Sequence, residues 1–392
     1  MSAQTSPTVP GSRPAPALPW PALLALSAAA FTAVTTELLP AGLLPAMSAD
    51  LGVSEARIGF LVTGFAVTGF LTAIPVTAAV RGLPRRPVLV AVLCGFALLN
   101  LVTAVSSAYP LTFAARVLAG VMGGTLWAML VGYAARTVPP ERRGRAIAVV
   151  SAGITLALCA GLPAGAAVAA ATGWRAAFAA LALLAGLLAL VVRWQAPALA
   201  PEPPASRTPL RRVATLPGAR TALAVTVVVI LAHHAVYTYL APLAGPAWTG
   251  VTLLVFGLST VAGVWATGVV IDRHPRRALL TALALVAVTM TLLGLTGHPA
   301  ALLGGAILWG VAFGGIPTLL QTALINATGA ANADVATSMQ TTVYNLGIAA
   351  GSFAGGLVLD ASGAAALPWT ALPLLAAALV TVALARRHAF PR

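Results

Sequence analysis

The sequence contains no lysine, only eight acidic residues and only two cysteines among its 392 residues. Charged residues make up 8% of the chain and hydrophobic residues 59%, whereas a soluble domain carries about 25% charged residues. This composition excludes an ordinary soluble domain, and the high hydrophobicity excludes an intrinsically disordered chain. Cys94 and Cys159 both lie inside apolar runs, so neither a disulfide framework nor a zinc-binding pattern is expected.

Long apolar runs, in contrast, are abundant. A membrane-spanning helix needs roughly 20 apolar residues. Such runs lie near residues 20–45, 56–80, 88–107, 110–135, 145–170, 175–194, 220–244, 248–271, 278–296, 300–326, 335–358 and 367–385. They are apolar on all sides, which argues against the alternating strands of a transmembrane barrel. We therefore predict an all-α polytopic membrane protein with one transmembrane helix for each of these runs.

Two polar, proline-rich stretches divide this pattern. Residues 1–19 carry five prolines and one charge and are predicted to form a disordered cytoplasmic tail. A signal peptide is the less favoured interpretation, because its basic segment would be a single Arg13. Residues 195–219 hold six prolines and are predicted to be a cytoplasmic linker between helical bundles at 20–194 and 220–385, with a short cytoplasmic tail at 386–392.

Arginine placement predicts the orientation of the chain. If the N-terminus lies in the cytoplasm, 19 of the 22 arginines fall in cytoplasmic segments. Only Arg57 and Arg175 then fall outside, and Arg116 falls within a helix. Because positively charged loops stay on the cytoplasmic side, both termini are expected in the cytoplasm. The net charge of +14 therefore reflects topology and does not indicate a nucleic acid partner.

The two halves of the chain repeat each other at an offset of 191 residues. Pro84-Arg85-Arg86 matches Pro275-Arg276-Arg277, Gly123-Gly124 matches Gly314-Gly315, and Gly165 matches Gly356. Each pair occupies the same place in its six-helix half. Parallel repeats of this kind are typical of transporters, in which the binding site lies between the halves near the bilayer midplane.

Glu37 and Arg116 are the charged residues that lie well inside apolar runs. Glu37 lies ~12 Å from the outer end of its helix and Arg116 ~9 Å from the outer end of its own, at helical rise. A charge in hydrocarbon is costly, so such residues face a cavity and usually pair. We interpret them as a proton site, because a carboxyl that alternates between environments changes its proton affinity. Two alternatives remain: a fixed ion pair that orients the first helix beside the fourth, and a Glu37 that is merely hydrated near the interface.

Other large polar or aromatic side chains inside the apolar runs are candidates for a substrate cavity. A small amphipathic ligand needs an apolar pocket with a few polar groups. The candidates are Asn100, Trp127, Tyr237, Gln321, Gln340, Tyr344 and Asn345. His233 and His234 are neighbours on a helix and point about 100° apart, so they are not expected to share a metal ion; a proton relay at one of them stays open. No cofactor is expected.

Several motifs resemble the major facilitator superfamily, in its 12-helix drug:proton antiporter branch, and most closely the bacterial sugar-efflux and chloramphenicol-efflux permeases. The likeness runs from about residue 20 to 385. It rests on Thr36-Glu37-Leu38-Leu39-Pro40-Ala41-Gly42-Leu43-Leu44-Pro45, Asp50-Leu51-Gly52-Val53-Ser54, Arg116-Val117-Leu118-Ala119-Gly120, Gly161-Leu162-Pro163-Ala164-Gly165, Gly173-Trp174-Arg175, Tyr237-Thr238-Tyr239-Leu240-Ala241-Pro242 and Asn345-Leu346-Gly347.

The resemblance implies roles for particular residues. It links Arg116 to proton coupling, and it identifies Gly153, Gly161, Pro163 and Gly165 as the antiporter motif of the fifth span (helix 5), which favours efflux. Tight packing between helices is the local role that we expect of these residues in either case. It also implies that Asp272, Arg273, Arg276 and Arg277 latch the inner gate, the alternative being that these arginines only set topology. The first-half loop, Arg81-Gly82-Leu83-Pro84-Arg85-Arg86, lacks the corresponding Asp.

These observations favour a proton-coupled antiporter that exports a small organic molecule across the bacterial plasma membrane. Its expected partners are that molecule, protons and the lipid bilayer, and we expect a monomer. A proton-coupled importer or facilitator of the same fold is the alternative. A membrane-embedded enzyme or receptor is remote, because an enzyme should show several convergent acids, histidines or nucleophiles.

Overall fold

The computed structural model describes residues 18–80, 83–198, 215–271, 273–295, 298–329, 332–386 and 388–390. Most of the tail predicted at 1–19, most of the linker predicted at 195–219, and Asp272 lie outside these described residues. The described part of the chain is helical throughout its regular structure and contains no strand.

The first half of the chain is built from helices that run up and down through the bundle. They are α1 (Trp20–Gly42), α2 (Leu44–Leu51), α3 (Glu55–Val80), α4 (Arg85–Val105), α5 (Tyr109–Arg136), α6 (Arg143–Leu156), α7 (Leu162–Thr172) and α8 (Trp174–Gln195). Helices α6 and α7 make one span through the π turn Ala157–Gly161. Helix α2 is short and leads from α1 into α3.

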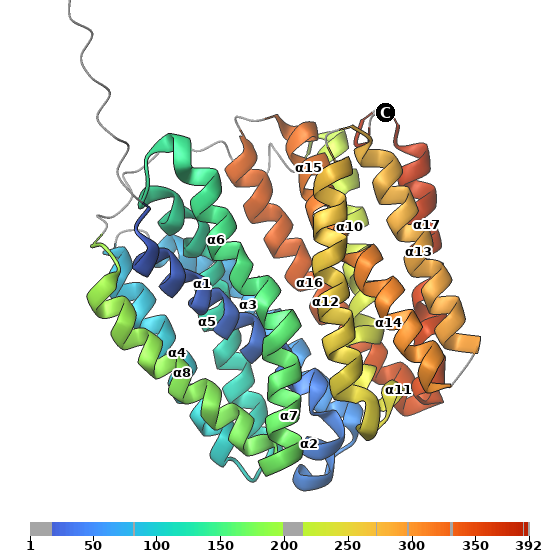
Figure 1. Ribbon diagram of the computed structural model, residues 1–392, viewed down its shortest axis with the longest axis horizontal. Coiled ribbons are helices and arrows are strands. Elements are labelled where there is room, and N and C mark those ends of the chain that lie inside the picture. Colours follow the sequence, from blue (N-terminus) through green and yellow to red (C-terminus); the bar gives the residue numbers. More distant parts are fainter. Residues whose placement is uncertain are drawn as a thin grey trace, which may run out of the picture.

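The second half repeats this arrangement. Its helices are α10 (Pro217–Tyr237), α11 (Leu240–Ala244), α12 (Pro246–Val270), α13 (Pro275–Leu295), α14 (Pro299–Gly314), α15 (Ile316–Thr328), α16 (Ala333–Ser362) and α17 (Leu367–Leu384). Figure 1 shows the two halves side by side, with α2 and α11 at the same end of the bundle and the C-terminus at the opposite end.

Length and composition identify the membrane spans. Among the described residues, eleven helices are long and apolar enough to cross a membrane, and the bent pair α2–α3, with an angle of 109°, makes a twelfth. The predicted all-α membrane fold is therefore confirmed. Many of the side chains that this fold leaves exposed are large and apolar, such as Leu183, Leu292 and Val380, as expected for helices that face lipid.

Proline and glycine set the helix breaks. Pro163 has no N–H for the carbonyl four residues earlier, and the helix widens just before it into a π turn, where Leu162 N bonds to Ala157 O. Gly315 and Pro317 separate α14 from α15 in the corresponding way. Gly52 ends α2 with φ +64°, a left-handed conformation that glycine adopts without strain.

The spans alternate in direction, so the loop arginines gather at one end. We call the end with the C-terminus the arginine-rich end: it holds the starts of α4, α6 and α13 and the ends of α5, α8 and α17. The opposite end, which we call the α2 end, holds Arg57 and Arg175. There Asp50 accepts hydrogen bonds from Arg175 and from Trp174 Nε1, which ties α2 to the start of α8.

Candidate functional site

Arg116 caps the break in α1. Pro40 cannot donate a hydrogen bond to the carbonyl of Thr36, four residues earlier, so that carbonyl is left without its helical partner. The Arg116 Nη2 group on α5 donates to Thr36 O at 2.6 Å and to Glu37 O at 3.2 Å. The guanidinium also lies 5.0 Å from the ring centre of Phe65. The charge predicted to face a cavity is thus fully buried and bound to backbone.

The side chains of Glu37 and Arg116 do not form the ion pair that the sequence left open as an alternative. They are neighbours, but no hydrogen bond or ion pair joins them: Arg116 donates only from Nη2, to the carbonyls of α1, and its Nε and Nη1 are buried without a partner. Glu37 Oε1 is buried without a hydrogen-bond partner. The two residues do share a depth, as predicted, and the carboxyl of Glu37 is left unengaged.

Asn100 is a second brace on α1 rather than a residue seen to line a cavity. It is buried on α4, and its Nδ2 donates to Thr36 Oγ1 at 3.0 Å. Thr36 is therefore held through its hydroxyl by α4 and through its carbonyl by α5. These two contacts fix the segment of α1 that carries Glu37.

Two of the predicted cavity residues link Glu37 to the second half. Tyr344 on α16 lies near enough to Glu37 to interact with it electrostatically. It interacts in the same way with Tyr237 on α10. Gln340, one turn before Tyr344, donates from Nε2 to Pro317 O at 3.1 Å, and its Oε1 is buried without a partner. Glu37 of the first half therefore lies in the same buried region as Tyr344 and Tyr237 of the second half.

The remaining cavity candidates make other contacts. Asn345 faces the other way from Tyr344, toward Gly69 of α3. Gln321 donates to Thr337 Oγ1 at 3.2 Å and joins α15 to α16. Trp127 is half-buried on α5, against both apolar clusters of the interior. The structure thus places Tyr237 and Tyr344 near each other, and Gln340, Asn100, Trp127, Gln321 and Asn345 in separate contacts.

An aromatic cluster surrounds His233, one turn before Tyr237 on α10. The His233 ring stacks on Phe313, with centroids 3.5 Å apart, and on Tyr237, at 5.1 Å. Trp309 and Phe256 meet the same imidazole at 5.1 Å and 6.0 Å. The rings of His233 and His234 are nearly perpendicular, and no group of three metal-ligating side chains occurs in the described part of the chain.

Several buried polar atoms on these helices have no partner, and we call them the unpaired polar set. They are Thr35 Oγ1, Glu37 Oε1, Asn100 Oδ1, Arg116 Nε, Arg116 Nη1, His233 Nδ1, His234 Nδ1, Thr252 Oγ1, Trp309 Nε1 and Gln340 Oε1. A buried polar atom without a partner costs about 1–3 kcal/mol. They come from α1, α4, α5, α10, α12, α14 and α16, that is, from both halves. The sequence did not predict Thr35, Thr252 and Trp309 as site residues, because a single polar residue in an apolar run has no characteristic spacing to another.

The antiporter motif lies in the fifth span, which α6 and α7 form, and its residues pack that span against α1. A methyl group at Gly153 would overlap the Ser27 carbonyl, and one at Gly161 would meet Thr35 Oγ1 and the Phe31 ring. Gly165 faces Leu39, and Pro163 follows the π turn. This geometry corresponds to the close packing expected as the local role of these residues.

Of the four residues predicted to latch the inner gate, Asp272 lies outside the described residues. Arg273 and Arg277 are exposed at the arginine-rich end. Arg276 donates from Nε to Val382 O at 3.3 Å and from Nη2 to Ala383 O at 2.9 Å. These bonds tie α13 to α17 within the second half and do not cross to the first.

Comparison with known proteins identifies the family. The model of the Major Facilitator Superfamily matches residues 25–266 and 244–391. The chain therefore belongs to this superfamily of membrane transporters, which confirms the resemblance drawn from the motifs, and it is not an enzyme.

Similar proteins include efflux pumps. The chloramphenicol resistance protein of Streptomyces lividans is 33% identical over 362 residues, which cover 89% of this chain and 92% of that protein. The chloramphenicol efflux pump Rv0191 of Mycobacterium tuberculosis (strain ATCC 25618 / H37Rv) is 31% identical over 382 residues and 91% of each chain. The purine ribonucleoside efflux pump NepI of Escherichia coli (strain K12) is 28% identical over 348 residues, 87% of this chain and 88% of the pump.

A solved structure shares the fold. The crystal structure of the human organic anion transporter MFSD10 (TETRAN) superimposes with a TM-score of 0.69 and 19% sequence identity, covering 93% of this chain and 98% of that one.

Proposed function

We propose that the protein is a proton-coupled antiporter that exports a small organic molecule by alternating access, acting as a monomer in a bacterial plasma membrane. The observation that carries the proposal is the buried, unengaged carboxyl of Glu37 beside Tyr344 of the opposite half. A charged carboxylate in such a place is costly. A carboxyl that gains and loses a proton as the halves move relative to each other couples that motion to the proton gradient.

The substrate class follows from the surroundings of this carboxyl. The unpaired polar set supplies both donors and acceptors, and the aromatic cluster around His233 supplies flat apolar faces. A molecule with an aromatic ring and several hydroxyl or amide groups would satisfy both. Chloramphenicol and purine ribonucleosides, the molecules in the names of the similar efflux pumps, are of this kind.

The contacts between the halves support alternating access. At the α2 end, Ser54, just before α3, donates to Asp360 of α16 at 3.4 Å, and the rings of Phe60 and Phe353 lie 5.3 Å apart. We infer that the α2 end is closed in this state and that the binding region communicates with the arginine-rich end. In the opposite state these contacts separate, and the arginines at 273–277 with Asp272 latch the other end.

We propose that the arginine-rich end lies in the cytoplasm, with the tails 1–19 and 386–392 and the linker 195–219 that joins the bundles 20–194 and 220–385. The support is the positive-inside rule and the gathering of loop arginines at that end. Reporters that are active only in the cytoplasm should be active when they are fused after Ala200 or at the C-terminus. Reporters that are active only in the periplasm should be inactive at both places. A periplasmic signal from either fusion would contradict this orientation.

Replacing Glu37 by Gln tests the coupling. Glutamine keeps the size and hydrogen-bonding ability of the side chain but cannot titrate. We expect the variant to lose uphill transport driven by an imposed pH gradient in inverted vesicles, while substrate binding and exchange down a substrate gradient persist. Exposed Glu141→Gln is the matched control and should transport normally.

Three results would contradict this proposal. Full gradient-driven transport by Glu37→Gln would place the proton site elsewhere, with His233 or His234 next to test. Loss of substrate binding along with transport would make Glu37 a direct substrate contact. Accumulation of substrate inside cells, rather than its removal, would favour the importer.

A further inference from the structure

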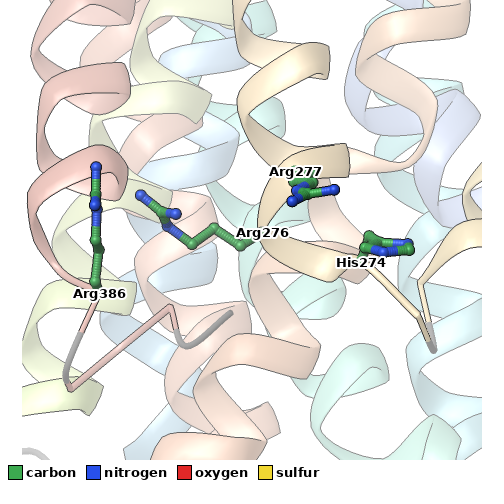
Figure 2. A pocket seen from close by; sticks show the side chains of 4 residues that line it. All are labelled: His274, Arg276, Arg277 and Arg386. Atoms are coloured by element: carbon green, nitrogen blue, oxygen red, sulfur yellow. The ribbon is translucent and has the colours of Figure 1, made fainter.

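A basic pocket lies between α13 and α17 at the arginine-rich end. It has a volume of about 400 Å³ and is lined by His274, Arg276, Arg277 and Arg386. Figure 2 shows Arg276 reaching from the first turn of α13 toward Arg386 at the end of α17, with Arg277 and His274 on the other side of that turn. None of these four lining residues is acidic.

The positive charge around the pocket exceeds what nearby acids can neutralise. The described residues 273–277, 386 and 388–390 include four arginines and no acid. The one acid next to them in the sequence, Asp272, can neutralise only one arginine. Arg276 and Arg386 both donate to Ala383 O, at 2.9 Å and 3.0 Å. That carbonyl lies at the C-terminal end of α17, where helical carbonyls lack intrahelical partners. It holds the two guanidinium groups in place but brings only a partial charge.

The position of the pocket is that of a lipid headgroup. It lies between the first turn of one membrane span and the end of another, which is the depth of the bilayer interface. Val380 and Leu384, one turn apart on α17 just before Arg386, are 55% and 77% exposed. Helix α17 therefore presents apolar surface of the kind that acyl chains cover directly next to a cluster of arginines.

We propose that this basic pocket binds the phosphate headgroup of an anionic phospholipid. Arginine donates paired hydrogen bonds to phosphate oxygens, and the N-terminal end of α13, which begins at Pro275, adds a favourable dipole. The bound headgroup would bridge α13 and α17 in the second half. This proposal does not depend on proton coupling or on the transported molecule, because the pocket lies at the bundle end, away from Glu37. It shares Arg276 and Arg277 with the latch proposed for the opposite state.

The experiment measures lipid retention by the full-length purified protein. The protein is incubated with equimolar phosphatidylglycerol and phosphatidylcholine, and the bound lipids are counted by native mass spectrometry. We expect a clear preference for phosphatidylglycerol that high salt weakens. The double variant Arg277→Gln/Arg386→Gln should bind phosphatidylglycerol about thirtyfold more weakly, roughly fivefold for each arginine.

Matched variants separate this site from a general effect of charge. Arg193→Gln removes an exposed arginine at the same end, in the last turn of α8, and should leave the preference unchanged. Arg277→Lys keeps the charge and should retain most of the binding, whereas Arg277→Gln alone should lose about fivefold. The single variants keep the test valid if the double variant does not fold.

Three results would overturn the proposal. They are unchanged phosphatidylglycerol retention in the Gln variants, an equal loss in Arg193→Gln, and equal retention of the two lipids by the unmodified protein. Inorganic phosphate and glycerol phosphate form the second arm of the test. If either displaces phosphatidylglycerol at matching concentration, the pocket is a site for free phosphate and the lipid assignment is wrong; if neither does, the acyl chains contribute as proposed.

Discussion

At the residue scale, Arg116 shows how a proline break and a buried charge stabilise each other. Pro40 removes one hydrogen bond from α1 and exposes the Thr36 carbonyl inside the bundle. In a bilayer no water is present to replace the lost donor. The guanidinium of Arg116 supplies it from α5, and Asn100 holds the same residue from α4. A structural requirement of α1 thus places a positive charge next to Glu37.

Replacing Arg116 by Ala should destabilise the protein because the carbonyls of Thr36 and Glu37 lose a buried donor. The expected cost is about 1–3 kcal/mol for each unsatisfied group, seen as a lower Tm in detergent. Adding Pro40→Ala to this variant should recover part of the loss, since an alanine at that position has an N–H that can reach the Thr36 carbonyl. Alone, Pro40→Ala should have a smaller effect on Tm. Equal Tm values for the Arg116→Ala variant and the unmodified protein would show that the carbonyls do not need this cap.

At the element scale, glycine sets the distance between α1 and the span formed by α6 and α7. Gly153 lies against the backbone of Ser27, and Gly161 against Thr35. The two helices can therefore approach until backbone touches side chain, which is how spans associate where no hydrophobic effect acts between them. A glycine also allows close packing between the two halves. Gly257 of α12 lies against Leu158, and Cys159 Sγ donates to Gly257 O at 2.9 Å.

Replacing Gly153 by Ala should push α6 away from α1. The new methyl group would overlap a backbone carbonyl that cannot rotate aside, and overpacking of this kind costs about 1–3 kcal/mol. Gly144→Ala, in the same helix, is the matched control because nothing lies within 4 Å of a methyl group there. It should leave Tm unchanged or raise it slightly. The ordering of the two Tm values is the measurement, and similar values would argue against close packing at Gly153.

At the scale of the whole molecule, Tyr239 is a contact between the two halves near the α2 end. It follows α10, and its hydroxyl donates to Ser352 O at 2.6 Å on α16. Its ring fills the space above Gly59 of α3 and Gly356 of α16, where a methyl group would overlap it. One side chain therefore packs against both halves. Any motion that opens this end must withdraw Tyr239 from Gly59.

A cross-link between the halves at the α2 end should stop transport. Ser54→Cys and Asp360→Cys, introduced with Cys94→Ser and Cys159→Ser, place two thiols where the native side chains are hydrogen-bonded. We expect a short bifunctional maleimide to join them and reduce transport to background, because the closed end can no longer open. Disulfide formation should do the same and be reversed by reductant. The variant with Ser54→Cys alone should stay active, and full transport by the cross-linked protein would rule out alternation at this end.

The sequence by itself determined the membrane class, the number of spans and the repeat of the two halves. Each of these follows from local composition: a run of roughly 20 apolar residues spans a bilayer wherever it lies, and proline and glycine break helices wherever they occur. The depth of Glu37 and Arg116 followed in the same way, because helical rise converts residue number into distance.

Only the tertiary structure decided which groups meet. It turned the guanidinium of Arg116 toward the Thr36 carbonyl instead of the Glu37 carboxylate, used Asn100 as a brace on α1, and joined Arg276 to α17. It also placed Tyr344 of α16 near Glu37 of α1 and near Tyr237 of α10, which stacks on His233. These outcomes depend on the rotation of each helix about its axis. In apolar helices with little amphipathic character the sequence does not encode that rotation, and packing between neighbouring helices sets it.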